Sequence, residues 1–244
     1  MVVQVKPFTK LAAVYDDLMV DIQYESWIDF MLTVVEKRGL KDSKALELGC
    51  GTGNATVVMN SRGFSVTGLD SSPYMLGFAR SKLPSLQFVR ADFETFVLDE
   101  RYPFVYSVFD TLNNLLDPSA FRNMAQRVFK HLEASGIFVF DLNTTIGLRE
   151  LWDGNRIEGS VNGVDYIWEH SFDEANALAR IEVSWENNGQ KFREVHFERG
   201  YDIGEVRNII QAVGFTNVEV LVYPSGRPAT GDEPRVWVVA KKGV

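Results

Sequence analysis

A glycine-rich turn constrains the fold of this chain more than any other feature. The segment Ala45-Leu-Glu-Leu-Gly-Cys-Gly-Thr-Gly-Asn54 is an apolar run followed by glycines at three alternate positions, Gly49, Gly51 and Gly53. Glycines let a backbone turn sharply out of a strand and approach a ligand with no side chain in between. Asp70 ends the next apolar run, 21 residues after Gly49. An acid at an offset of about 20 residues suits a ribose, so the pattern predicts a nucleoside site.

The spacing of the glycines indicates which nucleoside binds. Dinucleotide-binding turns read G-x-G-x-x-G, with a third glycine beside the helix that holds the pyrophosphate. Here Asn54 and Ala55 follow Gly53 instead. Glu47 precedes the turn, and an acid facing the ligand repels a pyrophosphate but attracts an ammonium or a sulfonium. S-adenosylmethionine carries both cations, and we predict it as the ligand.

Several motifs resemble those of the class I S-adenosylmethionine-dependent methyltransferases, and the resemblance covers nearly the whole chain. The matching stretches are Glu47-Leu-Gly-Cys-Gly-Thr-Gly53, Leu69-Asp70-x-Ser72-x-x-Met75-Leu76, Ala91-Asp92-Phe93, Phe109-Asp110-Thr-Leu-Asn-Asn114 and the strand-like segment from Gly136 to Thr144. One glycine-rich turn alone is weak evidence, whereas several motifs in the family's order are specific.

The first 145 residues alternate short apolar runs with helical patterns. This rhythm is typical of repeated βαβ units around a parallel sheet. Buried strands are predicted at 44–48, 65–69, 86–90, 104–109 and 136–141, and helices at 24–38, 54–61, 72–82 and 119–131.

After Thr145 the pattern changes to alternating polar and apolar residues, typical of antiparallel hairpins. Strands are predicted at 165–172, 178–186 and 191–201, followed by a helix at 202–213 and strands at 217–222 and 235–241. We therefore expect an α/β, Rossmann-like, seven-stranded and mostly parallel sheet with flanking helices. The resemblance implies an antiparallel final strand pair. Residues 1–145 and 202–244 are predicted to form the cofactor-binding domain, and 146–201 an inserted antiparallel β-meander that covers the acceptor site.

Asp70 is the sharpest prediction for cofactor binding, as a ribose ligand. The alternative is that Asp70 caps the helix that begins near Pro73. The resemblance implies that Asp92 faces the adenine amino group, that Met75 packs on the adenine and that Tyr15 covers the methionine end. The full set of predicted cofactor residues is Tyr15, Trp27, Glu47, Gly49, Cys50, Gly51, Gly53, Asp70, Ser71, Met75, Ala91, Asp92, Phe93 and Phe109.

The acceptor site is predicted after the fourth strand. Methyl transfer from a sulfonium mainly requires alignment and a dry cavity, and a base matters only for some acceptors. The resemblance places the acceptor beside Asp110, which we expect to position it, and beside Asn113 and Asn114.

Side-chain parity in the segment 191–201 divides its residues into two sets. Glu194, His196 and Glu198 share one face of the strand, and His196 is expected to face solvent. Arg199 and Tyr201 lie on the other face. A resemblance to related methyltransferases makes these two candidate acceptor-binding residues, and plain sheet packing is the alternative.

Composition limits the remaining possibilities. The 244 residues are 45% hydrophobic, which is enough for one substantial core. A net charge of −8 disfavours nucleic acid and anionic membranes as partners. One cysteine, Cys50, and three histidines offer no metal-site spacing, and the Cys50 thiol is assigned no chemistry. The N-terminus has no signal-peptide pattern and no apolar run reaches about 18 residues, so a cytoplasmic monomer or homodimer is expected.

The expected activity is methyl transfer to nitrogen or oxygen of a small-molecule acceptor. Methylation of RNA or protein is a second possibility, although Asp110 is followed by Thr-Leu-Asn instead of the Pro-Pro-aromatic sequence of base-amine methyltransferases. A third is a non-catalytic S-adenosylmethionine-binding regulator. A nicotinamide oxidoreductase is disfavoured by the missing third glycine.

Overall fold

A seven-stranded sheet forms the centre of the protein in a computed structural model that describes residues 2–243, apart from the Leu151 side chain. The five parallel strands of this sheet run in the order expected when successive βαβ units reverse direction once. From one edge to the other the strands are β11 (Phe215–Leu221), β12 (Arg235–Lys242), β6 (Leu132–Asn143), β5 (Tyr102–Ser107), β2 (Lys44–Leu48), β3 (Ser65–Asp70) and β4 (Gln87–Arg90).

Strand direction confirms the expected fold class. The pairs β2–β3, β2–β5, β3–β4 and β5–β6 are parallel, whereas β12 is antiparallel to both β6 and β11. The order reverses between β2 and β5, since β3 lies on one side of β2 and β5 on the other. Ligands of open α/β sheets bind outside the carboxyl ends of the strands at such a reversal.

Helices cover both faces of this sheet because each buries one apolar stripe. Phe121 and Met124 of one helix and Ile210 of another pack on one face. Met31 and Met59, from two further helices, pack on the other. The helices are α2 (Tyr24–Glu36) and α3 (Asn54–Ser61) on the second face, α5 (Pro118–His131) and α7 (Ile203–Val213) on the first, and α4 (Pro73–Lys82) beside β4.

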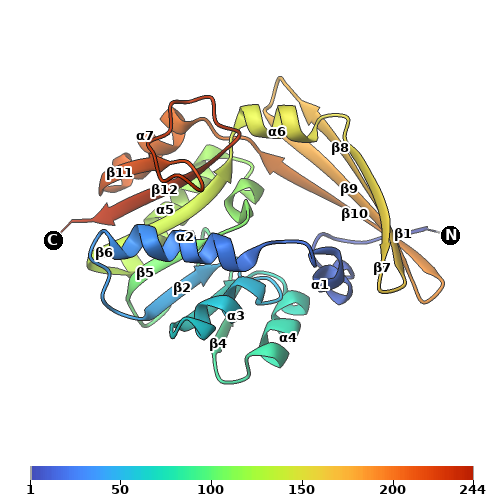
Figure 1. The fold of residues 1–244 in the computed structure, drawn as a ribbon, viewed down its shortest axis with the longest axis horizontal. Coiled ribbons are helices and arrows are strands. Elements are labelled where there is room, and N and C mark those ends of the chain that lie inside the picture. Colours follow the sequence, from blue (N-terminus) through green and yellow to red (C-terminus); the bar gives the residue numbers. More distant parts are fainter. Residues whose placement is uncertain (1, 244) are drawn as a thin grey trace.

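A second sheet rises beside the carboxyl ends of the parallel strands (Figure 1). It has five strands where the sequence predicts three, in the order β1 (Val2–Gln4), β10 (Gln190–Arg199), β9 (Leu178–Asn187), β8 (Val164–Asp173) and β7 (Arg156–Val161). The helix α6 (Thr145–Trp152) leads into it. Neither α6 nor β7 is predicted, because the residues from Arg156 to Val161 carry exposed side chains with little apolar alternation.

The amino-terminal segment also belongs to this second sheet. Strand β1 pairs in parallel with β10, and a short turn, η1 (Leu11–Ala13), and helix α1 (Tyr15–Leu18) follow. The buried Glu194 carboxylate accepts hydrogen bonds from the backbone N–H groups of Phe8 at 2.7 Å and Leu11 at 3.0 Å. Residues 2–18 are thereby held against the inserted sheet, near the carboxyl ends of the parallel strands. No helix within residues 2–243 has the length and apolar content to span a membrane.

Candidate functional site

The glycine turn after β2 has the backbone that its sequence predicts. Gly49, Gly51 and Gly53 have φ of +70°, +54° and +87°, in the left-handed region that other residues adopt only with strain. A Cβ built on Gly49 lies 2.2 Å from the Thr111 Cγ2 atom, whereas one built on Gly51 meets nothing within 4 Å. The turn is therefore closely packed at Gly49 and open at Gly51, as a backbone that approaches a ligand requires.

Asp70 lies at the end of β3, directly against this turn. Its Oδ2 atom accepts a hydrogen bond from the Gly51 N–H at 2.9 Å, and Oδ1 accepts one from the Ser72 N–H at 2.8 Å. Burial raises the pKa of Asp70, and the two backbone donors counteract part of that shift. Ser72, not Asp70, caps α4, since its hydroxyl accepts from the Met75 N–H. The alternative role considered for Asp70, the N-cap of α4, thus belongs to Ser72.

Glu47 lies behind the turn and not in front of it, which corrects the expectation that it faces the ligand. Its side chain is 2% exposed and accepts hydrogen bonds from the hydroxyls of Thr56 and Tyr106. Burial raises the pKa of Glu47 to about 7, although both hydrogen bonds lower it. The alternation of β2 places this side chain inside the layer between the sheet and α3, where it braces the first turn of the helix.

The raised pKa of Glu47 predicts a pH dependence of stability. The native state holds the proton more tightly than the unfolded chain, so stability present below about pH 4.5 is lost as the pH rises through about 7. A shift from 4.5 to about 7 corresponds to about 3 kcal/mol of unfolding free energy. Urea denaturation from pH 4.5 to 8 measures it. Glu47→Gln should flatten this part of the profile, and the exposed Glu36→Gln should not. Equal slopes in Glu47→Gln and the wild type would refute the assignment.

The other predicted cofactor residues divide into two groups. Phe93, at the end of the third parallel strand, contacts the turn, with its Cζ atom 3.2 Å from a Cβ built on Gly49. Asp92 is exposed and caps the Glu94 N–H at 2.8 Å. Around them at the same sheet edge lie Ser71, Met75, Ala91 and Phe109.

Trp27 is partly buried among aromatic side chains, and Cys50 is buried. The Trp27 ring stacks on Tyr223 at 5.0 Å, with the Arg235 guanidinium 4.5 Å from its centre. The Cys50 thiol is buried against Gly68, and burial raises its pKa well above the ordinary value, which makes it a poor nucleophile. Any contribution of Cys50 to cofactor binding thus comes from its backbone.

A cavity of about 260 Å³ lies between the carboxyl ends of the parallel strands and the five-stranded sheet. Thr111, which contacts Gly49, lines it, so the cavity adjoins the glycine turn. Asp110 and Asn114, which the sequence predicts as acceptor residues, line it as well. Aromatic rings form much of the remaining wall, from Phe8, Tyr15, Tyr24, Phe109, Trp152 and Trp168.

The backbone after β5 is strained where it meets this cavity. Phe109 and Asp110 have φ of +60° and +52°. Such conformations cost about 1–3 kcal/mol each in residues other than glycine, and they concentrate at functional sites. The strain turns the Asp110 carboxylate toward the cavity, where it accepts a hydrogen bond from the Asn143 side chain at 2.9 Å.

Acidic groups outnumber basic groups at this edge. Arg235 of β12 donates to the Asp141 carboxylate at 2.7 Å and lies 3.4 Å from Asp110. Burial alone lowers the pKa of Arg235, but the two carboxylates outweigh it and raise that pKa. Asp141, which is fully buried at the end of β6, has its pKa raised by burial despite Arg235. One guanidinium thus serves two carboxylates.

The face of β10 that was expected to point to solvent points into the cavity. His196 is 7% exposed and lines the cavity together with Glu198, so its expected solvent exposure is wrong. The odd positions face outward, and Phe197 is 43% exposed. This polar inner face was missed because its partners, such as Phe8 against His196 at 4.6 Å, lie far away in sequence.

Three of the predicted acceptor residues lie outside the cavity. Arg199 pairs with Glu205 at 3.0 Å, and Tyr201 packs on Phe121 with its hydroxyl donating to the Leu115 carbonyl. Asn113 is fully buried and donates to the carbonyls of Asn143 and Arg199. These side chains join β10 to the main domain, as the packing alternative for Arg199 and Tyr201 predicts.

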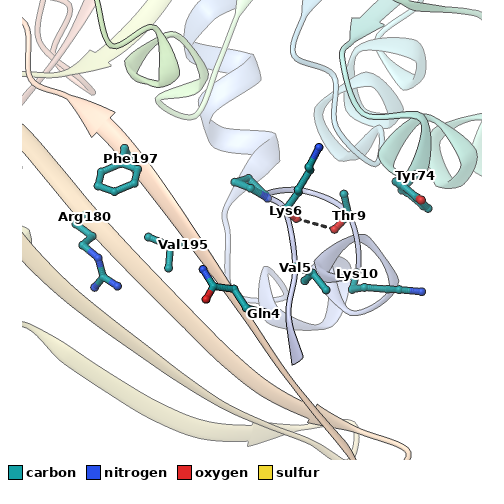
Figure 2. A pocket seen from close by; sticks show the side chains of 10 residues that line it. Gln4, Val5, Lys6, Thr9, Lys10, Tyr74, Arg180, Val195 and Phe197 are labelled. Carbon is teal, nitrogen blue, oxygen red and sulfur yellow. Dashed lines mark hydrogen bonds between the residues drawn. The ribbon is translucent and has the colours of Figure 1, made fainter. Parts of the chain in front are cut away.

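An open groove of about 790 Å³ lies on the outward face of β10 (Figure 2). Val195 and Phe197 form its floor, and Lys6, Lys10 and Arg180 give it positive charge. Figure 2 shows that the charged ends of Lys6 and Lys10 point away from one another. The groove therefore lacks a converging set of ligand groups. Within residues 2–243, no group of three or more acidic, histidine or cysteine side chains is arranged to hold a metal ion.

Known proteins are similar to this chain in sequence and in fold. A family model described as a methyltransferase domain matches residues 45–136. The protein named Putative methyltransferase YqeM, from Bacillus subtilis (strain 168), is 28% identical over 242 residues, which cover 95% of both chains. A solved S-adenosylmethionine-dependent methyltransferase from Clostridium acetobutylicum ATCC 824 has a TM-score of 0.83 at 24% identity, over 96% of this chain and 98% of that one.

A second solved structure is similar in fold. The sugar N-methyltransferase KedS8 from Streptoalloteichus sp ATCC 53650 has a TM-score of 0.81 at 19% identity, over 97% of this chain and 94% of that one. The matched methyltransferase domain spans the glycine turn and the strands that carry it. Over this domain, over the length of the whole-length relative and in its seven-stranded fold, the chain is similar to S-adenosylmethionine-dependent methyltransferases.

Proposed function

We propose that this enzyme methylates a nitrogen or oxygen atom of a small molecule bound in the cavity between the two sheets. The small size and aromatic lining of the cavity are the observation that carries the proposal. Its volume of about 260 Å³ and its aromatic walls suit a small organic molecule. A nucleic acid or protein acceptor requires an open approach, and here residues 2–18 and β10 stand across it.

The residues around the glycine turn fit the cofactor. We assign the turn backbone at Gly49, Gly51 and Gly53 to the methionine end and the Asp70 carboxylate to the ribose. Asp92 and Met75 are assigned to the adenine. When bound, S-adenosylmethionine supplies a methyl group that is already activated on a sulfonium.

The chain's own contribution is alignment and exclusion of water. Tyr15, Phe109 and Asp110 line the cavity and are assigned to orient the acceptor. Asp110 is suited to this role because Asn143 and Arg235 hold its carboxylate in place. A fixed carboxylate aligns a donor group of the acceptor with little loss of side-chain entropy.

Two arguments favour nitrogen over oxygen. The acid-rich cavity attracts an amine in its cationic form. KedS8, whose fold this chain shares, is a sugar N-methyltransferase. A non-catalytic regulator is the remaining alternative, and a test for turnover separates it from an enzyme.

Thermal-shift and turnover measurements test the proposal. S-adenosylhomocysteine should raise the melting temperature, because a ligand at about 100 times its Kd stabilises the native state by about 2.7 kcal/mol. A panel of small amines and their hydroxyl analogues, incubated with S-adenosylmethionine, should then yield S-adenosylhomocysteine. Stabilisation by NADH but not by S-adenosylhomocysteine would overturn the cofactor assignment. Turnover on RNA or protein alone would overturn the acceptor assignment.

A further inference from the structure

We infer that the acceptor is an amine that enters the cavity as a cation, and that Glu198 takes the proton which the amine must lose before it reacts. This inference rests on the proposed function and specifies its acceptor chemistry. It concerns a residue to which neither the sequence motifs nor the family match assigns a role.

Glu198 projects from β10 into the cavity. Its carboxyl group takes a hydrogen bond from the Asn143 side chain. Its Oε2 atom is inaccessible to solvent and has no hydrogen-bond partner within the described part of the chain. An unpartnered buried acceptor is destabilising, so such an atom calls for an explanation. A donor group on the acceptor molecule satisfies it.

The acids around Glu198 share one cation. Arg235 is hydrogen-bonded to Asp141 and lies 3.4 Å from Asp110, and it acts on Glu198 through its charge. Burial raises the pKa of Glu198 well above its ordinary value and Asp110 raises it further, although Arg235 and Asn143 lower it. An entering ammonium supplies a second cation. The titratable and charged groups that line the cavity or flank Glu198 are Tyr15, Tyr24, Asp110, Asp141, Glu194, His196 and Arg235.

The aromatic wall favours the same ligand chemistry. Trp168 stands on the strand β8 and Tyr15 on helix α1 beside it, and Phe109 lies on the main-domain side. A cation over aromatic rings is attracted by the ring quadrupole, more strongly when water is excluded. A carboxylate acceptor gains nothing from these rings and is repelled by Asp110 and Glu198. The cavity therefore discriminates for an amine and against an acid of the same size.

Methyl transfer to the amine requires no reactant other than the amine, Glu198 and the bound cofactor. The ammonium nitrogen gives one proton to Glu198 Oε2 and regains its lone pair. That pair forms the new N–C bond as the C–S bond of the bound cofactor breaks, and the electrons of the broken bond stay on sulfur. The product leaves as an N-methylammonium ion, and Glu198 releases its proton to solvent once the cavity opens.

Binding of a fixed cation tests the charge assignment. The probe is tetramethylammonium, which cannot titrate, and the neutral control is tert-butanol, which is similar in size. Both are titrated calorimetrically into enzyme saturated with S-adenosylhomocysteine between pH 5 and 9. As Glu198 ionises, tetramethylammonium should bind at least about tenfold more tightly at the upper end, a gain of about 1.4 kcal/mol. The affinity for tert-butanol should not change.

Variants connect this pH dependence to Glu198. Glu198→Gln should abolish it, whereas Glu198→Asp, which keeps the carboxylate, should retain it. Glu169→Gln makes the same chemical change on the exposed face of the inserted sheet and should behave as the wild type. Retained binding of S-adenosylhomocysteine shows that each variant is folded. With an amine that turns over, Glu198→Gln should lower kcat/KM by about 10²–10⁴ and remove the corresponding limb of its pH profile.

The outcomes separate the two proposals. If S-adenosylhomocysteine does not bind, the proposed function fails. If it binds, but tetramethylammonium affinity is independent of pH or unchanged in Glu198→Gln, the inference about Glu198 fails alone. Preference for tert-butanol over tetramethylammonium at every pH would likewise overturn it.

Discussion

Gly49→Ala is expected to weaken S-adenosylmethionine binding by about 100-fold. The new Cβ lies 2.2 Å from the Thr111 Cγ2 atom, and the residue must keep a φ of +70°. Left-handed backbone alone costs a residue other than glycine about 1–2 kcal/mol. Relief of the overlap shifts Thr111 or the turn, and together these effects reach about 2.7 kcal/mol, which corresponds to about 100-fold. Calorimetry with S-adenosylhomocysteine measures the loss.

Gly63→Ala is the matched control for this substitution. Gly63 follows α3 with a φ of +88°, and a Cβ built there meets nothing within 4 Å. The control therefore carries the backbone cost without the overlap, and it should reduce stability while leaving cofactor affinity unchanged. Equal affinities of Gly49→Ala and the wild type would show that the turn is not the binding site.

Asp70→Ala is expected to weaken cofactor binding by more than about tenfold. The substitution removes the proposed ribose ligand and leaves the N–H groups of Gly51 and Ser72 without their acceptor. A hydrogen bond to a charged group contributes about 1.5–3 kcal/mol, and a loss of 1.4 kcal/mol is already tenfold.

Asp42→Ala provides the comparison for Asp70→Ala. Asp42 also accepts a backbone hydrogen bond, from the Lys44 N–H at 2.8 Å, but it lies at the opposite end of β2. Its substitution should leave the affinity for S-adenosylhomocysteine unchanged. Calorimetry that finds no difference between Asp70→Ala and Asp42→Ala would remove Asp70 from the site.

The main sheet was predictable because its signals are local. Strand β2 and helix α3 begin and end at the predicted residues, Lys44–Leu48 and Asn54–Ser61. Short apolar runs and glycine breaks within a few residues determine such elements. The three-glycine turn and the acid at the end of β3 follow from the same local pattern, and the structure brings them together at 2.9 Å.

The acceptor side was harder to predict because its contacts are non-local. The prediction for His196 assumed that the apolar positions of β10 face inward. They do not, because the apolar side chains of the inner face come from β9, such as Ile181 and Val183, and β10 adds polar residues beside them. Glu194 is buried because the backbone of residues 8–11 supplies its donors. No pattern within β10 reveals such a partner.

The pairing of the amino-terminal segment with β10 has a consequence for biosynthesis. Phe8 and Glu194 are separated by 186 residues, and β1 has no strand partner other than β10 within residues 2–243. Pairing across so long a separation forms only after both segments exist. On the ribosome, strands β2 to β5 and the glycine turn emerge first, and the amino-terminal segment waits for β10. The cavity between the two sheets is therefore among the last parts of the protein to close.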